Sequence, residues 1–264
     1  MTANFFQNLK SRKIEYLLIS GQATVLYGAA TFSEDIDLWI NPTRANCEAF
    51  LDLLRFCGGR YYKLTPPFTF ANLERGHGFH FVLPDESGQE VFLDIMGAPP
   101  RVGAFEIAVR SAVWMDTQWG GIHTIGLKDL VEIKKTQRLE DYPIISKLAL
   151  AWFEHRDCQK TPDDFRWALG NIFTLTELRT LFEEHPKAIL AVPEGDSAAD
   201  LRMYSQLVGL DQSVSEKVYE NLTISMQRRM GLLQQADRVY WRGIIAELKD
   251  FRNKGTLMEE SSRV

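Results

Sequence analysis

Two aspartates in one short apolar segment are the residues whose type and spacing point most directly to chemistry. Asp35 and Asp37 are two residues apart in DIDLWI, where Ile36, Leu38 and Ile40 are apolar. Because side chains alternate between the two faces of a strand, both carboxylates should point to the same side. Two adjacent negative charges repel unless a cation lies between them, so the pair is a candidate site for Mg²⁺, with Mn²⁺ as an alternative. An exposed acidic strand face is the other interpretation.

A third carboxylate lies in a second apolar run. Asp94 is in VFLDIM, where a single buried charge would be costly without a partner. If its strand neighbours the strand of Asp35, the three aspartates form one cluster of metal ligands. Two-metal phosphoryl transfer needs such a cluster, because one ion activates the attacking oxygen and the other neutralises the leaving group. The alternative for Asp94 is a hydrogen-bonded structural carboxylate.

A turn of small residues precedes the aspartate pair. The run IEYLLIS at 14–20 predicts a buried strand, and apolar residues at helical spacing follow at 21–28. The strand therefore ends at Ser20 and Gly21, where the backbone N–H groups of the new helix and the serine hydroxyl could bind a phosphate. One helix and a turn fit between Gly21 and Asp35, so the aspartates could return beside this turn.

A pair of basic residues lies further along the chain. The segment 126–138 predicts a helix on which Lys134 and Arg138 are one turn apart and share a face. The two cations could hold a triphosphate, and Asp141 would either cap the next helix or orient Lys134. A solvated pair of cations is the alternative. His77 and His80 form a weaker candidate metal pair, since no cysteine lies near them in the sequence.

Taken together, the first group of motifs resembles the nucleotidyltransferase fold of the polymerase β superfamily. The family pattern is a glycine followed by Gly or Ser, a spacer, and then D-x-D with a later aspartate on another strand. The matching residues here are Ser20, Gly21, Asp35, Asp37 and Asp94. The resemblance covers residues 14–150.

The segment GLKDLVEIKKTQRLED is similar to the pattern DL-x3-K-x3-R-x2-D of bacterial toxin-like nucleotidyltransferases from abortive-infection and toxin–antitoxin systems. The matching residues are Asp129 and Leu130 for DL, then Lys134, Arg138 and Asp141. This chain departs from those relatives before the D-x-D, where Thr31 and Ser33 stand in place of an arginine and a threonine. The departure affects an extra phosphate or structural contact and leaves the metal ligands intact.

The resemblance implies a Mg²⁺-dependent nucleotidyltransferase that transfers a nucleoside monophosphate from an NTP to an acceptor hydroxyl. The metal and catalytic residues would be Asp35, Asp37 and Asp94, and the nucleotide-binding residues Ser20, Gly21, Lys134, Arg138 and Asp141. The expected acceptor is RNA, including the 3′ end of tRNA, or a protein, and a cognate antitoxin is a candidate partner. Three alternatives stay open: a degenerate nucleotide-binding protein on the same fold, a small-molecule transferase of the aminoglycoside type, and a metal-dependent nuclease.

Composition places the chain among ordinary globular proteins. It has 264 residues, of which 45% are hydrophobic and 25% charged, and this excludes disordered, collagenous and coiled-coil classes. A net charge of −5 is not that of a polybasic nucleic-acid module. The sequence begins without a secretory signal pattern and has no apolar stretch of membrane-spanning length. We therefore expect a cytoplasmic protein without a membrane partner and with reduced thiols at Cys47, Cys57 and Cys158.

The elements that must position these residues alternate in the first part of the chain. Predicted strands cover 14–20, 35–40, 78–83, 90–96 and 105–110, with a hairpin between the third and fourth. Predicted helices cover 21–28, the stretch from the turn at 41–43 to Phe56, 126–138 and 141–155. After residue 157 only helices are predicted: one capped at Thr161, then 174–184, 197–207 and 213–253, the last with a break near Gly231. The predicted class is an α/β (α+β) mixed sheet of nucleotidyltransferase type with flanking helices in a domain at 1–156, followed by an all-helical domain at 157–264.

Overall fold

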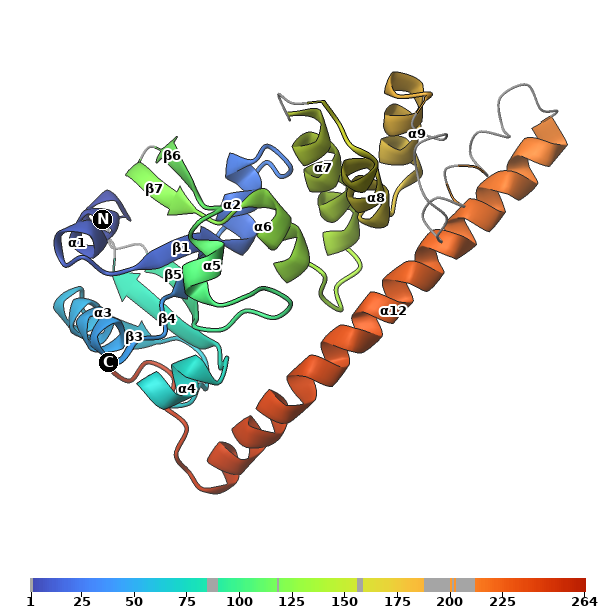
Figure 1. The fold of residues 1–264 in the computed structure, drawn as a ribbon. Helices are drawn as coiled ribbons and strands as arrows, with labels where there is room; N and C mark the ends of the chain where they lie inside the picture. The colour runs from blue at the N-terminus through green and yellow to red at the C-terminus, as the bar shows by residue number, and fades with distance from the viewer. Residues whose placement is uncertain are drawn as a thin grey trace. The chain divides into compact units, whose positions relative to one another are not determined.

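A computed structural model describes residues 2–84, 90–117, 119–155, 159–187, 200, 202 and 212–264, with only the backbone at 2, 3 and 212–215 (Figure 1). The chain divides into two compact units, Met1–Ile133 with Val239–Val264, and Lys134–Arg238. The boundary between residues 156 and 157 stays a prediction about independently folding domains. Within the described ranges, no helix has the length and apolar character to cross a membrane.

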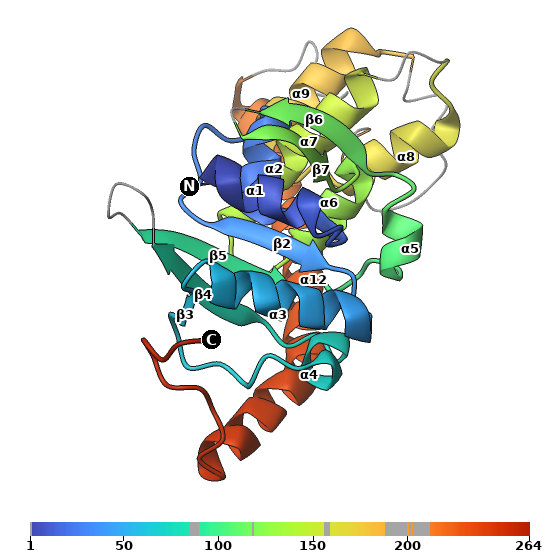
Figure 2. The same cartoon turned by 90° about the vertical axis from the view of Figure 1, so that its left-hand side faces the viewer.

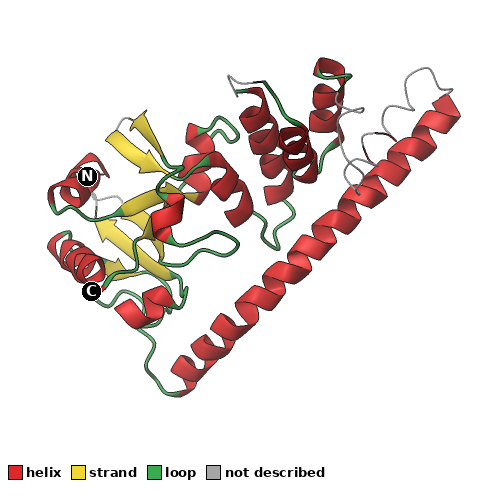
Figure 3. Ribbon diagram, in the orientation of Figure 1, coloured by secondary structure: helices red, strands yellow, loops and turns green. Residues whose placement is uncertain are grey.

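A seven-stranded mixed sheet organises the first unit (Figure 3). Its strands, in chain order, are β1 (Tyr16–Ile19), β2 (Ile36–Ile40), β3 (Arg60–Tyr61), β4 (Phe79–Pro84), β5 (Glu90–Met96), β6 (Val113–Thr117) and β7 (Gly120–Thr124). In space their order is β3-β4-β5-β2-β1-β7-β6. The pairs β2–β5 and β1–β7 are parallel and the other neighbours are antiparallel. The mixed sheet that the sequence predicted is therefore confirmed.

The helices described before residue 134 flank this sheet: α1 (Thr2–Ser11), α2 (Ser20–Leu26), α3 (Arg44–Phe56), α4 (Phe70–Glu74), α5 (Phe105–Ala108) and α6 (Leu127–Ile133). Figure 2 shows α1 and α3 side by side in front of the sheet, while α2 and α6 lie together on its other side. Side-chain caps begin α3 and α4, because Thr43 and Thr69 each accept a hydrogen bond from a backbone N–H three residues on.

The core of this unit lies along its central strands. The side chains of β1 from Leu17 to Ile19, and those of β2 from Leu38 to Ile40, are buried at consecutive positions. Consecutive burial is typical of strands that are covered on both faces. The largest of these side chains, Trp39, donates its indole N–H to the Gly97 carbonyl at 2.8 Å, so its polar atom is satisfied inside the core.

The second unit is helical in its described residues. It contains α7 (Asp141–Glu154), α8 (Pro162–Gly170), α9 (Leu175–Glu184) and the first part of α12 (Gln212–Asn253). Its core includes Phe153, Phe165, Leu169, Leu181 and Leu222. The predicted cap at Thr161 is confirmed, because its side chain and that of Asp164 each bind the other's backbone N–H.

Three predicted elements differ from the structure. Residues 105–110 form the short helix α5 instead of a strand, because Phe105 and Ala108 are the buried positions and their spacing is helical. The helix predicted at 126–138 ends at Ile133. Gly231 does not interrupt α12, which is continuous over 42 residues. The helix predicted at 197–207 lies largely outside the described residues.

The C-terminal segment returns to the edge of the sheet in the first unit. Residues Thr65 and Met258, and Arg60 and Arg263, form isolated antiparallel bridges. The Tyr61 N–H donates to the Ser262 carbonyl at 2.9 Å, and further backbone hydrogen bonds continue to the chain end. The backbone groups of edge strand β3 are thus paired with the last residues of the chain.

Candidate functional site

Two of the predicted carboxylates lie at matched positions of adjacent strands. Strands β2 and β5 are parallel, and Asp37 is the Cα partner of Asp94. Partners at matched positions point to the same face of a sheet, and neighbouring strands are about 4.8 Å apart. The neighbouring strands that a carboxylate cluster requires are therefore present in the fold.

Asp35 lies directly before β2, and the charge of Asp94 affects the pKa of its carboxyl group. Burial raises the pKa of Asp35, and the negative charges of Asp94 and Glu34 raise it further, whereas Lys63 and His80 lower it. Asp94 is the largest charge contribution, so the two carboxylates lie within electrostatic reach of each other. Asp35 and Asp37 are both half-buried and flank the buried Ile36, as strand alternation predicts.

The turn of small residues lies beside Asp37. Helix α2 begins at Ser20, directly after β1, and the last residue of β1, Ile19, is the Cα partner of Asp37. The Gly21 N–H donates to Asp37 Oδ2 at 3.4 Å. A Cβ atom on Gly21 would lie 2.2 Å from Ser33 Oγ, so a larger residue here would require Ser33 to shift. Ser20 has a φ of 55°, in the left-handed region that non-glycine residues rarely adopt.

The helix α2 is seven residues long, so its dipole is weak, and the N–H of Gly21 is directed at a carboxylate. The turn therefore orients Asp37 in this structure. Phosphate binding by Ser20 and Gly21 stays a prediction.

His80 is the residue of this site that sequence reasoning did not place. Strands β4 and β5 pair His80 with Asp94, and Nδ1 of the histidine lies 2.7 Å from Oδ1 of the carboxylate. His77 instead lies 2.9 Å from Glu247 through Nε2 and Oε2, so the two histidines contact different carboxylates. The sequence does place His80 in the hairpin whose second strand carries Asp94. The register of that hairpin, which decides whether the two side chains meet, could not be predicted from the sequence.

The donor set suits a metal ion that binds together with its substrate. Across the residues with described side chains, no three His, Cys, Asp or Glu side chains form a ready set of ligands for one ion. Mg²⁺ is usually held by one or two carboxylates, with substrate phosphates and waters completing its shell. The aligned pair of Asp37 and Asp94 fits that donor set. The raised pKa of Asp35 reflects burial first and then the negative charge of Asp94, and a cation would relieve that repulsion.

The other predicted residues form a buried cluster in the second unit. The Asp141 carboxylate accepts hydrogen bonds from Lys134 Nζ at 3.1 Å, Arg138 Nε at 3.0 Å and Thr136 Oγ1 at 2.7 Å. The side chain of Lys134 is 7% exposed and that of Asp141 is 4% exposed, whereas Arg138 is largely solvent-accessible. Asp141 therefore orients Lys134, as one of the two interpretations of the sequence had it.

The shared helix face predicted for Lys134 and Arg138 is wrong. Both residues follow the end of α6 at Ile133 and lie in the segment before α7. They are brought together by Asp141, the first residue of α7, and by Thr136, whose hydroxyl also accepts the Arg138 backbone N–H at 3.1 Å. Nucleotide binding by Lys134, Arg138 and Asp141 stays a prediction.

Comparison with known proteins gives remote structural likenesses. No protein-family model and no curated protein matches the sequence. One similar structure is a candidate nucleotidyltransferase from Thermotoga maritima, 11% identical with a TM-score of 0.33, covering 48% of this chain and 75% of that one. Another is an antigenic nucleotidyltransferase-like protein from Paracoccidioides brasiliensis, 15% identical with a TM-score of 0.37, covering 75% and 94%. The α/β architecture implied by the resemblance is present, and at these TM-scores the superpositions place no residue of the site.

Proposed function

We propose that this chain is a metal-dependent nucleotidyltransferase, which transfers a nucleoside monophosphate from an NTP to an acceptor hydroxyl and releases pyrophosphate. The observation that carries the proposal is the alignment of Asp37 with Asp94 on adjacent parallel strands, with Asp35 in electrostatic reach. Like charges are held together there at a cost in stability, which is typical of sites that bind cations.

Asp37 and Asp94 would hold Mg²⁺, with Asp35 adding negative charge beside them. When bound, the metal would neutralise the charge of the triphosphate and activate the acceptor hydroxyl. The chain's own residues fix the carboxylates: the Gly21 N–H holds one oxygen of Asp37, and His80 holds one oxygen of Asp94. Partners of this kind orient carboxylates and keep their rotamers ready for a ligand.

The acceptor is the less constrained part of the proposal. Following the sequence resemblance, we propose RNA, including the 3′ end of tRNA, or a protein side chain as the acceptor, and a cognate antitoxin as a partner. The alternative is a degenerate protein that binds nucleotides without transferring them. Measuring both nucleotide binding and turnover distinguishes it from a transferase.

Replacement of Asp37 by Asn tests the proposal, because it keeps the shape of the side chain and removes a charged ligand. The protein is incubated with Mg²⁺, each α-labelled NTP, and total cellular RNA or protein, and label transfer and pyrophosphate are measured. We expect transfer by the wild type and only background transfer by Asp37→Asn, with the melting temperature unchanged or raised because like-charge repulsion is relieved.

Asp52→Asn is the matched control, since Asp52 lies on the exposed surface of α3 and its ion pair is with nearby Arg55 at 3.4 Å. It should transfer label like the wild type. Equal turnover by Asp37→Asn and wild type would overturn the mechanism. Calorimetric binding of Mg²⁺–NTP without pyrophosphate release from any substrate pool would favour the degenerate binding protein.

A further inference from the structure

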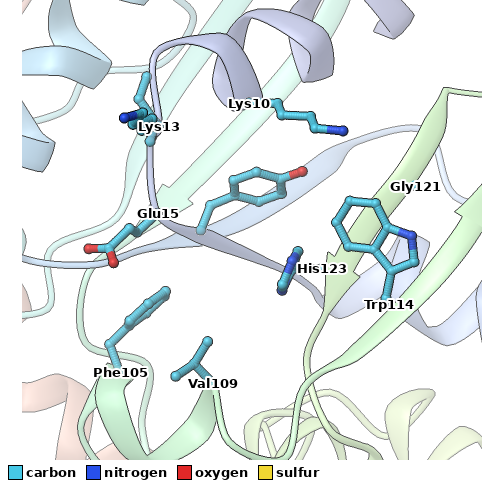
Figure 4. A pocket seen from close by; sticks show the side chains of 10 residues that line it. Lys10, Lys13, Glu15, Phe105, Val109, Trp114, Gly121 and His123 are labelled. Carbon is cyan, nitrogen blue, oxygen red and sulfur yellow. The ribbon is translucent and has the colours of Figure 1, made fainter.

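A pocket of about 330 Å³ opens in the first unit, at the start of β1 (Figure 4). It is lined by the end of α1, by α5 and by the β6–β7 hairpin, with Lys10, Lys13, Tyr16, Phe105, Trp114 and His123 among its residues. Strand β1 runs from Tyr16 at this pocket to Ile19, which precedes the Ser20–Gly21 turn. The pocket and that turn are therefore about 13 Å apart along the strand, at about 3.3 Å per residue.

An indole ring held in place forms one wall of the pocket. Trp114 is 50% exposed although it is a large apolar side chain. A Cβ atom on Gly121 would lie 2.1 Å from the ring, so the indole packs directly on the backbone of the neighbouring strand. His123, the Cα partner of Trp114, contacts the ring edge-on with centroids 4.7 Å apart. A flat surface that is already ordered loses little conformational entropy when a ligand stacks on it.

One lysine lies near this indole, and a second lysine lines the pocket farther from it (Figure 4). Lys10 Nζ lies 5.8 Å from the Trp114 ring centroid, and Lys13 lines the same pocket. Among the residues that the structure describes, no carboxylate lies within salt-bridge distance of either lysine. Glu15 accepts a hydrogen bond from Asn41 Nδ2 at 2.8 Å, and Figure 4 shows its carboxylate directed away from Trp114. The indole end of the pocket therefore carries the positive charge of Lys10.

The phenol of Tyr16 adds a hydrogen-bond donor. Burial raises the pKa of Tyr16 to about 12, so its hydroxyl stays protonated at neutral pH. A protonated phenol can donate to an anion and cannot repel it. Aromatic surface, the cation of Lys10, the more distant cation of Lys13 and a neutral donor thus line one cavity.

We propose that this pocket binds an aromatic anion, with a planar ring stacked on Trp114 and its negative group on Lys10 and Lys13. The cavity volume is at the lower end of the range of about 300–1,000 Å³ that holds small ligands. A nucleoside monophosphate and an aromatic carboxylate share this chemistry. The proposal uses no residue of the carboxylate site, so it stands apart from the proposed transferase activity.

Calorimetric titration without divalent cations tests the pocket, with AMP, adenosine, inorganic phosphate and indole-3-acetate as probes. We expect AMP to bind more tightly than adenosine or phosphate, because only AMP presents both ring and charge. Trp114→Ala should weaken AMP binding about tenfold, the usual scale of one base–aromatic stack, and Trp114→Phe should restore part of it. Lys10→Ala with Lys13→Ala should reduce AMP affinity to that of adenosine. Indole-3-acetate binding more tightly than AMP would identify the carboxylate as the preferred anion.

Matched controls separate the pocket from general surface effects. Phe56 is 68% exposed and carries Arg12 over its ring at 5.0 Å, outside the pocket, so Phe56→Ala should bind AMP like the wild type. The exposed Lys217 and Lys249, both changed to Ala, serve as the control for loss of two positive charges. Asp37→Asn should also keep AMP binding, whatever its transferase activity. The proposal is overturned if neither aromatic anion binds, or if AMP binding is lost in Asp37→Asn and retained in Trp114→Ala.

Discussion

The ionised form of Asp35 is disfavoured in the folded protein. Burial, followed by the charge of Asp94, raises the pKa of Asp35 above the ordinary value of 3.8. Because the folded state then binds a proton more readily than the unfolded chain, the free energy of unfolding falls as the pH rises from 3.8 through the folded pKa. The carboxylate cluster therefore costs stability at neutral pH.

Asp35→Asn should raise the melting temperature at neutral pH, because the uncharged amide avoids both the desolvation and the repulsion by Asp94. Well below the ordinary pKa of an aspartate, the wild-type carboxyl is protonated and the gain should vanish. Thermal unfolding of both proteins across this pH range measures the effect, with the exposed Asp52→Asn as control. An equal shift at every pH would show that the charge of Asp35 is not responsible.

The close approach of Gly21 to Ser33 is a second feature at this scale. Gly21→Ala would place a methyl group 2.2 Å from Ser33 Oγ and 3.0 Å from its Cβ. We expect a loss of about 1–3 kcal/mol in the free energy of unfolding, the usual cost of overpacking. Ser33→Ala removes the nearer atom, so the double variant should recover part of that loss.

Denaturant unfolding of the wild type, both single variants and the double variant forms a double-mutant cycle. A favourable coupling between the two substitutions is the expected result. Strict additivity would mean that the backbone at Gly21 moves away from Ser33 at no cost.

The β1–α2–β2 element could be predicted from the sequence because its signals are local. An apolar run, a small-residue turn and an alternating run with two aspartates specify strand, helix and strand, and the observed bounds lie within a few residues of those predicted. The neighbour of β2 could not be predicted, since strand pairing is set by contacts distant in sequence. The contact between His80 and Asp94 depends on the β4–β5 register for the same reason.

The predictions that were wrong or missing concern short elements with mixed patterns. The run at 105–110 is too short for its apolar spacing to separate helix from strand. The β6–β7 hairpin was not predicted, because Val113–Thr117 has no apolar alternation and Gly120–Thr124 begins with two glycines. Packing between the two strands stabilises the hairpin, and the contact of the Trp114 ring with Gly121 is an example.

The segment between α6 and α7 depends on a buried ion pair. Lys134→Ala should lower the free energy of unfolding by about 3 kcal/mol, because the buried Asp141 loses its buried cation, while its contacts with the exposed Arg138 and with Thr136 remain. Replacing both members, with Lys134→Met and Asp141→Leu, should restore much of that stability. Denaturant unfolding measures both variants.

The same two variants distinguish a structural role of Lys134 from a role in nucleotide binding. NTP affinity is measured at a temperature at which all proteins are folded. If Lys134 holds the triphosphate, the double variant should regain stability and still bind NTP weakly. Recovery of stability and NTP affinity together would assign the lysine a purely structural role.

For the molecule as a whole, the C-terminal segment protects an edge of the sheet. Deleting residues 257–264 would expose the backbone of β3 and of its flanking residues, where Tyr61, Thr65 and Gly59 now hydrogen-bond to residues between Met258 and Val264. We expect a lower melting temperature and concentration-dependent light scattering, because unpaired strand edges pair with other chains. The control is Ser261→Ala with Ser262→Ala, which leaves the backbone hydrogen bonds in place. Unchanged scattering after the deletion would show that β3 is protected by other means.

The first unit is assembled from two stretches of chain, residues 1–133 and 239–264, while the second unit is continuous. During synthesis, the ribosome completes the second unit before the closing stretch of the first has been made. At about 5–20 residues per second, the residues after Ile133 take roughly 7 to 26 s to translate. Throughout that interval the nascent sheet lacks the partner of its β3 edge. The order of translation thus makes the half-built first unit, rather than the second, the expected client of chaperones that act on the growing chain.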